Sequence, residues 1–311
     1  MIKEVVDRIS DNIQKVIVGK REVIELTMVA LLCEGHILIE DVPGIGKTML
    51  AKAIARSIGC AFRRIQFTPD LLPSDVTGIS FFNQKNQAFE FRPGPLMAQV
   101  VLADEINRAT PRTQSALLEA MQEHQLTIDG ETYSLPRPFM VLATQNPIEL
   151  EGTFPLPEAQ IDRFLIQLGL GYPSEEEEND ILLRFEREDP LETLGPVVDA
   201  AVLLEMQREV RTIRVEESVR RYIVQVARAT REHPAVELGV SPRGTLSLYK
   251  TAQALAAIEG REYVIPDDAK RLAPYVLTHR IIISPQTRLR GRTPEEVMME
   301  IVDSVPVPVE E

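Results

Sequence analysis

The segment from Glu40 to Thr48 constrains the fold of this chain more than any other. It reads Glu-Asp-Val-Pro-Gly-Ile-Gly-Lys-Thr, follows an apolar run at residues 36–39 and precedes a run with helical character at residues 49–55. A loop with two glycines between a strand and a helix lets backbone N–H groups surround phosphate oxygens. The helix N-terminus adds positive potential at the same place. The segment therefore predicts a phosphate-binding loop between a strand and a helix.

The residues around the two glycines indicate which phosphate the loop binds. Lys47 is expected to reach the β- and γ-phosphates of a triphosphate, and Thr48 is expected to ligate Mg²⁺. Asp41 stands where the usual pattern has its first glycine, so Pro43 and Gly44 are expected to make the bend. A glycine loop can also join a strand to a helix for packing alone, but the Lys-Thr pair directly after it favours phosphate binding.

The composition is that of a soluble globular protein. The chain has 311 residues, enough for about two domains, with 44% hydrophobic and 26% charged residues. It has no apolar run long enough to span a bilayer, and its first residues mix charges without an apolar signal core. Cys33 and Cys60 form no CxxC pair, which fits a reducing compartment. We therefore expect a cytoplasmic protein without structural zinc.

The net charge of −13 disfavours binding to nucleic acid, because an acidic surface repels a phosphate backbone. One local basic cluster consists of Arg288, Arg290 and Arg292. We interpret this cluster as a solvated loop or a contact between subunits rather than a nucleic-acid site.

Short apolar runs alternate with helical patterns over the first part of the chain, which predicts a three-layer α/β fold around a parallel sheet. Two insertions interrupt this alternation. A β-hairpin is expected at residues 79–91, and a second at 126–135, where Asp129-Gly130 is typical of a type I′ turn. The pattern predicts strands at residues 36–39, 61–67, 100–103, 139–143 and 164–168, and helices at 1–17, 21–33 and 110–124.

Beyond Pro173 the chain is predicted to be almost entirely helical. Ser174 and Glu177 form a capping box that begins the first of these helices. Periodicity predicts helices at about 175–187, 198–210, 216–232, 242–258 and 266–278. We therefore expect an αβα domain at residues 1–180, a smaller helical domain at 181–283 and a C-terminal extension at 284–311 whose end is frayed.

Two carboxylates follow a predicted buried strand. Asp104 and Glu105 come directly after the apolar run at residues 100–103. Ligands bind at the carboxyl ends of parallel strands in such sheets. We expect Asp104 to hold Mg²⁺ and Glu105 to orient and deprotonate an attacking water. The alternative is that both acids cap the next helix.

Three further polar residues are candidate contacts for a γ-phosphate. Asn146 follows the strand at 139–143 and is expected to fix the water, although Asn-Pro is also a common turn signal. Arg163 precedes a strand, and Arg243 lies in the first turn of a helix, where its charge opposes the helix dipole and suggests an anionic partner. Arginine suits a phosphoryl transition state, while an ordinary salt bridge is the alternative for each.

These motifs, taken in order, closely resemble the MoxR family of AAA+ ATPases over about residues 10–285. Further similarity lies in the insertions, at residues 89–95 and 135–139. Several specific motifs in one order identify a family more strongly than any of them alone. The resemblance is carried by Val18-Gly19, Pro43–Thr48, Leu102–Ala109, Ala143–Pro147, Gln160–Phe164 and Ser241–Gly244.

The resemblance implies a nucleotide site. Val18 and Gly19 would lie against the adenine of ATP. Asp104 and Glu105 would be the Walker B acids, and Asn146 would be sensor 1. Walker A would comprise Pro43, Gly44, Ile45, Gly46, Lys47 and Thr48, with Thr48 and Asp104 holding Mg²⁺.

The resemblance also implies roles for arginines at a subunit boundary. Arg163 would be the arginine finger that reaches the nucleotide of a neighbouring subunit. Arg243 would be sensor 2, which reports the γ-phosphate to the helical lid. Arg108 and Arg112 lie nearby and are alternative candidates for the finger.

The implied function is ATP hydrolysis by a ring-forming motor, expected to be a hexamer, whose hairpins face the pore. The family implies a chaperone-like role in maturing a protein client, often by metal or cofactor insertion, with a von Willebrand factor A-domain protein as partner. A nucleic-acid motor is an alternative that the acidic charge disfavours. A nucleotide-gated scaffold with little turnover is disfavoured by the presence of Glu105 and Asn146. A small-molecule kinase would act as a monomer without a neighbour's arginine.

Overall fold

A five-stranded parallel sheet forms the centre of the computed structural model, which describes residues 1–146, 152–186 and 189–308. Its strand order is β2-β5-β8-β1-β9, and each neighbouring pair is parallel. The predicted α/β class with a parallel sheet is confirmed. The strands are β1 (Ile37–Glu40), β2 (Phe62–Gln66), β5 (Val100–Asp104), β8 (Met140–Gln145) and β9 (Ile166–Leu168).

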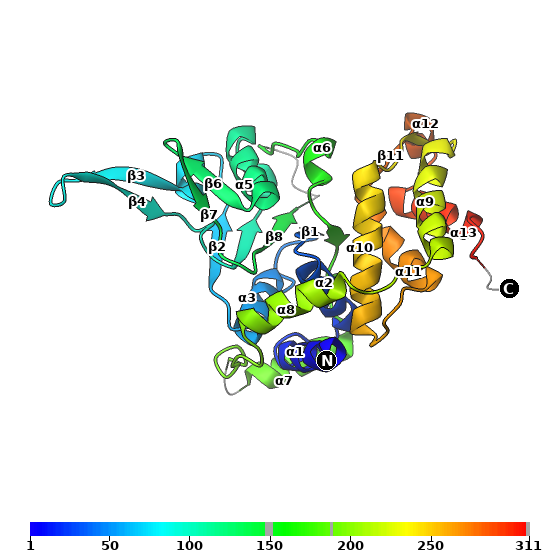
Figure 1. Cartoon of the computed structure of the whole chain (residues 1–311), viewed down its shortest axis with the longest axis horizontal. Helices are drawn as coiled ribbons and strands as arrows, with labels where there is room; N and C mark the ends of the chain where they lie inside the picture. Colours follow the sequence, from blue (N-terminus) through cyan, green and yellow to red (C-terminus); the bar gives the residue numbers. More distant parts are fainter. Residues whose placement is uncertain (147–151, 187–188, 309–311) are drawn as a thin grey trace.

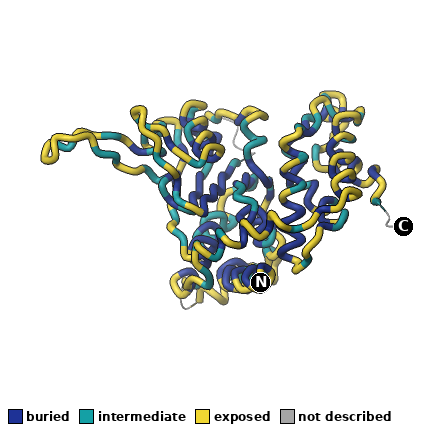
Figure 2. The backbone as a smooth tube through the Cα atoms, viewed as in Figure 1, coloured by how far each residue is buried: buried dark blue, intermediate teal, exposed yellow. Residues whose placement is uncertain are grey.

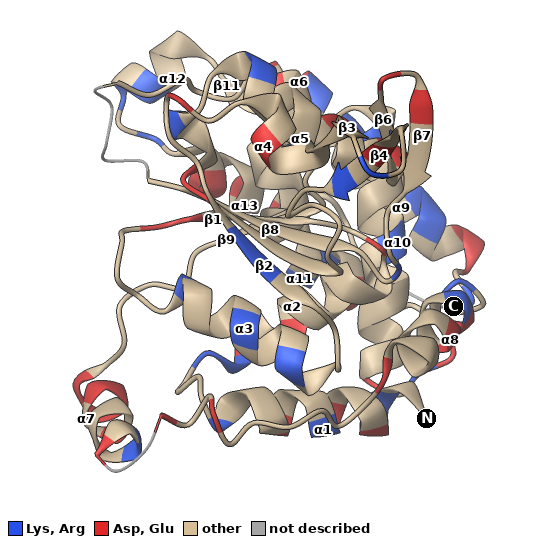
Figure 3. Cartoon of the chain, turned by 90° about the vertical axis from the view of Figure 1, so that its left-hand side faces the viewer, with Lys and Arg blue, Asp and Glu red and all other residues tan. Residues whose placement is uncertain are grey.

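Helices cover both faces of this sheet (Figures 1 and 3). The side chains of its strands alternate between the two faces. Leu102 on β5 packs in one core cluster with residues of α1 (Ile2–Gln14), α2 (Arg21–Leu32) and α3 (Lys47–Ser57). Its neighbour Val101 packs in a second cluster, with residues of α4 (Pro73–Thr77) and α5 (Pro111–Glu123). Apolar residues point to both sides of the strands, as buried parallel strands require. The buried residues concentrate in these layers (Figure 2).

The register of the strands brings their polar ends together. Gln66 at the end of β2 pairs with Asp104 at the end of β5, and Glu40 at the end of β1 pairs with Gln145 at the end of β8. Four strands therefore present polar residues at one edge of the sheet, directly before the loops that follow them.

Two antiparallel hairpins extend from the sheet domain at the left of Figure 1. The first consists of β3 (Gly78–Asn83) and β4 (Ala88–Pro93), and the second of β6 (Gln125–Ile128) and β7 (Glu131–Ser134). The second turns at Asp129 and Gly130, with φ of 51° and 86°, as the type I′ prediction requires. The hairpins touch where the rings of Phe91 and Tyr133 stack with centroids 4.1 Å apart.

The helical lid predicted for the second part of the chain is confirmed. Most of its helices pack beside the sheet domain at the right of Figure 1, whereas α8 lies against α2 through a hydrogen bond from Gln207 Nε2 to the Leu31 carbonyl (2.7 Å). Within the described ranges, no helix combines the length and apolar character needed to cross a bilayer. The helices are α7 (Glu175–Phe185), α8 (Ala200–Val210), α9 (Glu217–Glu232), α10 (Pro242–Ile258) and α11 (Pro266–Leu277), each within two residues of its predicted ends.

Four short elements near the C-terminus were not predicted from the sequence. They are η2 (Thr278–Arg280), β11 (Ile282–Ile283), α12 (Pro285–Leu289) and α13 (Pro294–Ser304). Strand β10 (Val236–Leu238), which lies earlier in the chain, was not predicted either. Helix α13 packs against α9 and α11 through buried Val297, Met298, Ile301 and Val302. The expected frayed end falls partly on residues 309–311, which lie outside the described residues. The domain limits at residues 180 and 283 stay predictions.

We predict that His36 makes the free energy of unfolding depend on pH. Both ring nitrogens are bonded inside the protein: Nδ1 accepts from Val141 N–H (3.0 Å) and Nε2 lies 3.1 Å from the Met121 carbonyl. Burial lowers the pKa of His36 from 6.5 to about 4. Because the native pKa lies below the unfolded one, the contribution is present above pH 6.5 and is lost as the pH falls towards 4, by roughly 3 kcal/mol.

Urea unfolding at a series of pH values between 7.5 and 4.5 measures this effect. In a His36→Gln variant, whose amide can both accept and donate, the free energy of unfolding should depend less on pH over this range. His279, whose pKa burial also lowers, is present in both proteins and contributes equally to the pH dependence of each. An unchanged pH dependence in the variant would therefore contradict the prediction for His36.

Candidate active site

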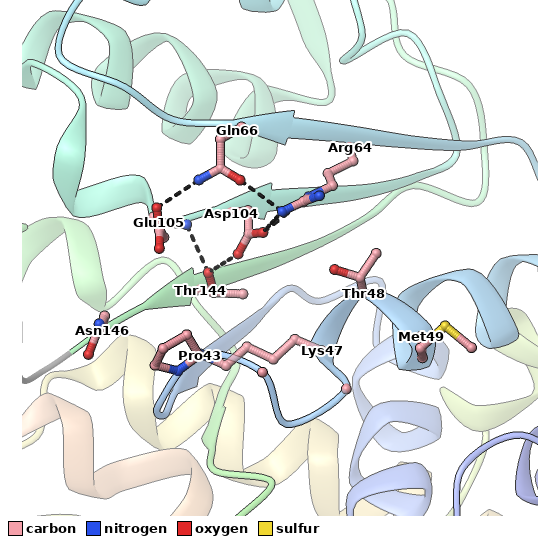
Figure 4. Close-up of a pocket in the computed structure, with 12 residues that line it drawn as sticks. Pro43, Lys47, Thr48, Met49, Arg64, Gln66, Asp104, Glu105, Thr144 and Asn146 are labelled. Carbon is pink, nitrogen blue, oxygen red and sulfur yellow. Dashed lines mark hydrogen bonds and ion pairs between the residues drawn. The ribbon is translucent and has the colours of Figure 1, made fainter. Parts of the chain in front are cut away.

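A cavity lies at the polar edge of the sheet and brings together most of the predicted site residues, among them the phosphate loop and both acids (Figure 4). It is bounded below by the loop before α3 and above by the ends of β2, β5 and β8. The residues that line it are Pro43, Gly44, Gly46, Lys47, Thr48, Met49, Arg64, Gln66, Asp104, Glu105, Thr144 and Asn146.

The loop between β1 and α3 owes its shape to its glycines. Gly44 and Gly46 have φ of 86° and 94°, a region that other residues rarely adopt. A Cβ atom at either position would meet nothing within 4 Å, so these glycines are required by the backbone and not by packing. Helix α3 begins at Lys47, which places the N-terminus of an 11-residue helix at the loop. Such a helix end is an anion site.

Asp41, which replaces the usual first glycine, fixes the loop through both carboxylate oxygens. Its Oδ1 accepts from Val42 N–H (2.8 Å), and its Oδ2 accepts from Gly171 N–H (2.7 Å), a residue beyond the end of β9. The ammonium of Lys47 donates to the Asp41 carbonyl (2.6 Å). Burial lowers the pKa of Lys47 below its ordinary value, opposed by nearby Asp41 and the two acids of the cavity. Asp41 therefore anchors the loop to the neighbouring strand.

Asp104 is held by two partners that the sequence did not identify. Arg64 on β2 forms an ion pair with Oδ2 (2.6 Å). Thr144 on β8 donates its hydroxyl to Oδ1 (2.6 Å) and accepts from the backbone N–H of Glu105 (2.8 Å). Thr144 is only 1% exposed, so this hydroxyl has no competition from bulk water. One threonine thus fixes both acids relative to β8.

Glu105 has an unusual backbone, and one oxygen of its carboxylate accepts two hydrogen bonds. Its φ and ψ of 57° and 52° lie in the left-handed region, which is strained for a non-glycine residue and is typical of functional sites. Its Oε2 accepts from Gln66 Nε2 (2.7 Å) and from Arg108 Nη1 (3.0 Å). Arg108, an alternative candidate for the finger, therefore contacts the acid of its own chain.

A second cavity lies on the other side of the same loop. Gly19 has φ of 72°, and a Cβ atom there would lie 1.5 Å from Glu177 Oε1 of α7. The glycine therefore allows α7 to lie close to the Val18-Gly19 turn. The cavity is mostly apolar, which suits a nucleotide base. Its lining is Val16, Ile17, Val18, Lys20, Pro43, Gly44, Ile45, Gly46, Met49, Leu170, Tyr172, Pro173, Glu178, Ile181 and Phe185.

The structure places the remaining predicted residues in two groups. Asn146 lines the first cavity, whereas Pro147 of its motif lies outside the described residues. Arg163 and Arg243 line neither of the two cavities. In the part of the chain that the structure describes, neither arginine side chain forms a hydrogen bond or an ion pair. A single chain therefore gathers the loop, the two acids and Asn146, but not the two arginines.

The sequence contained a weak signal for the residues that it did not identify. Arg64 and Gln66 are two apart at the end of the predicted strand 61–67, so they lie on one face, and Arg64 Nη2 donates to Gln66 Oε1 (2.8 Å). Thr144 directly follows the apolar run at residues 139–143 and precedes Asn146 by two residues. Only the strand order β2-β5-β8 shows that these side chains meet the two acids.

The fold and the cavity together define a class of protein. A model of the ATPase family associated with various cellular activities (AAA) matches residues 36–166, and a model of the AAA lid domain matches residues 228–301. The chain has the architecture of an AAA+ ATPase, an enzyme that binds and hydrolyses ATP. Its defining features are a parallel sheet, a Lys-Thr phosphate loop, paired acids and an attached helical lid.

Individual relatives narrow this class. The chain is 55% identical over 300 residues to the uncharacterized protein YeaC of Bacillus subtilis (96% of this chain, 94% of that protein). It is 41% identical over 306 residues to the chaperone MoxR1 of Mycobacterium tuberculosis (96% and 81%). A crystal structure of a candidate ATPase from Cytophaga hutchinsonii matches with a TM-score of 0.92 at 37% identity (99% and 96%). The chain belongs to the MoxR family of AAA+ ATPases.

We predict that Thr144→Val lowers kcat for ATP by roughly 10- to 100-fold, because small misplacements of catalytic groups carry costs of this size. Valine removes both the donor to Asp104 and the acceptor for Glu105 N–H while keeping the shape of the side chain. Thr144→Ser keeps the hydroxyl and should retain most of the turnover. Phosphate release measures kcat, and titration with a fluorescent ATP analogue tests that binding is kept. Equal turnover in the valine and serine variants would contradict the prediction.

Proposed function

We propose that this cavity binds the triphosphate of ATP with Mg²⁺ and that the adenine occupies the second cavity. The observation that carries the proposal is the convergence of the loop, both acids and Asn146 on one cavity. The backbone N–H groups of the loop and the ammonium of Lys47 would bind phosphate oxygens. Lys47 would exchange its bond to the Asp41 carbonyl for one to phosphate.

The donor set of the cavity fits a magnesium ion. Thr48 and Asp104 face the same cavity and supply a hydroxyl and a carboxylate, which are hard oxygen ligands. Once bound, Mg²⁺ would neutralise charge on the phosphates. Arg64 would have to release Asp104 Oδ2, while Thr144 keeps Oδ1 in place.

Glu105 is proposed to accept the proton of the attacking water, which Asn146 orients. In the described structure Gln66 and Arg108 both donate to Oε2 and hold the carboxylate at the cavity. Attack of the water oxygen on the γ-phosphorus breaks the bond to the β-phosphate oxygen and yields ADP and phosphate.

Glu105→Gln is expected to reduce ATP turnover by about 10²- to 10⁴-fold, the usual contribution of a general base, while ATP still binds. The amide is nearly isosteric but cannot accept the proton. Phosphate release and a fluorescent-ATP titration measure the two effects. Glu119→Gln on the exposed side of α5 is the matched control and should be neutral. Turnover close to that of the wild type in Glu105→Gln would refute the role.

We further propose that the active form is a ring of identical subunits, hexameric by analogy with the family, in which Arg163 reaches the nucleotide of a neighbour. The absence of Arg163 and Arg243 from both cavities supports this, since a cation with no partner among the described residues is available to an anion from another chain. Arg243 is proposed to sense the γ-phosphate and to transmit its loss to the lid, which would move the hairpins.

Mixing two inactive variants tests the arrangement in trans. Arg163→Ala should lower kcat by about 10³-fold or more, as loss of an arginine finger does. In a mixture of Arg163→Ala and Glu105→Gln subunits, some sites combine an intact Glu105 with an intact Arg163 from the neighbour, so turnover should rise well above that of either variant. A mixture no more active than its components would show that Arg163 acts within its own chain or not at all.

The proposed work is chaperone-like remodelling of a protein client in the cytoplasm. A 41% identical relative is named a chaperone, and the β3–β4 hairpin exposes apolar rings, with Phe82 51% and Phe89 74% exposed. Exposed apolar side chains on a projecting hairpin suit contact with a protein, and the net charge of −13 disfavours nucleic acid as the partner. By analogy with the family, we propose that this remodelling inserts a metal or cofactor into the client and that a von Willebrand factor A-domain protein is the partner. Stimulation of turnover by DNA at physiological salt would instead favour a nucleic-acid motor.

A further inference from the structure

Arg280 is a buried cation at the junction of the lid and the sheet. It ends the short helix η2, directly after α11, and its side chain is only 2% exposed. Burial lowers the pKa of Arg280 to about 10, so the guanidinium stays charged at neutral pH. A buried charge is costly unless its donors are satisfied, and here they bond both to residues 162–165 of the sheet domain and to Val276 and Ser247 of the lid.

The segment bound by Arg280 contains the proposed finger. Nε donates to Asp162 Oδ1 (2.7 Å), Nη2 to the Phe164 carbonyl (2.6 Å) and Nη1 to the Leu165 carbonyl (3.3 Å). These groups flank Arg163 on both sides, between α6 (Glu158–Ile161) and β9. The backbone of Arg163 is thus held by a side chain of the lid, while its own side chain is left available.

The same guanidinium also contacts the helix that carries Arg243. A Cβ atom on Gly244, in the first turn of α10, would lie 2.8 Å from Arg280 Cδ. Nη2 lies 3.4 Å from Ser247 Oγ one turn further along. The absence of a side chain at Gly244 therefore lets α10 pack directly on Arg280. The Arg280 guanidinium therefore contacts both the segment that contains Arg163 and the helix that carries Arg243.

Stability alone does not account for this arrangement. Buried ion pairs can often be replaced by apolar residues at no cost in stability, whereas the guanidinium here makes directional bonds to residues 162–165 and to the lid at once. A planar fork sets the distance and the angle between the lid and residues 162–165, which an apolar contact would not do.

We propose that Arg280 is a positioning residue for ATP hydrolysis, which fixes the finger segment to the lid and so sets Arg163 at the neighbour's nucleotide. This inference rests on the proposed action of Arg163 in trans. It assigns to Arg280 no contact with ATP. Its loss should therefore lower kcat and leave ATP binding at the loop intact.

Arg280→Lys tests the proposal because lysine keeps the charge but not the fork. We expect kcat to fall about 10- to 100-fold, as for other small displacements of catalytic groups, with KM for ATP within about twofold of the wild type. Asp162→Asn weakens the same link from the other side and should act alike; it decides the matter if Arg280→Lys does not fold. Unchanged kcat in a folded variant of either kind would overturn the proposal.

Mixing separates a positioning role from general damage. An Arg280→Lys subunit would have an intact nucleotide site but a misplaced finger, so Glu105→Gln subunits should restore its turnover, as they do for Arg163→Ala. Damage to the subunit's own site would give no recovery and would overturn the inference. Arg261→Lys is the matched control, since Arg261 forms a comparable fork with Asp268 (2.8 and 2.6 Å) within the lid, and it should leave kcat unchanged.

The two hypotheses fail differently. If the mixture with Arg163→Ala recovers turnover and the mixture with Arg280→Lys does not, the finger in trans stands and the positioning role falls. If Arg163→Ala alone turns over ATP like the wild type, the finger fails and the role of Arg280 falls with it.

Discussion

The candidate site depends on the parallel register of the central strands. The hydrogen bonds of the sheet pair Gln66 with Asp104 and Glu40 with Gln145, so strands far apart in the sequence end at one level. Apolar residues on both faces hold that register, because a slip by one residue would move every side chain to the opposite face. Of the polar residues at the ends of these buried runs, Gln66, Asp104 and Thr144 line the candidate site.

The sequence predicted correctly those elements whose structural signals lie within a few neighbouring residues. The loop from Glu40 to Thr48, the capping box at Ser174 and the turn at Asp129-Gly130 each contain their own structural signal, and the structure has the corresponding elements there. The five lid helices were predictable for the same reason, since periodicity and caps specify helices within a few turns. The α/β class followed from the alternation of these signals.

Residues whose roles depend on strand order could not be found in this way. Arg64 reaches Asp104 only because β2 lies beside β5, and Thr144 bridges both acids only because β8 lies on the other side. The left-handed backbone of Glu105 has no sequence signal, since glutamate rarely adopts it. In the sequence, Asp41 is only a departure from the usual glycine of the motif. The structure shows its role, because its carboxylate accepts a hydrogen bond from Gly171 N–H and so attaches the loop to the chain beyond β9. Helix α13 was overlooked although Thr293-Pro294 and Glu296 are a usual helix start.

Strand β9 links the two regions that these residues define. Its start is held from the lid, through the bonds of Arg280 to residues 162–165, and the backbone just beyond its end is held by the phosphate loop, through Asp41 and Gly171. Between these two points β9 pairs with β1, which leads directly into the loop. The strand is therefore attached at both ends, to the lid before its first residue and to the phosphate loop beyond its last. These contacts connect the phosphate loop, β9, residues 162–165 and the lid in one continuous series of hydrogen bonds that does not involve the hairpins.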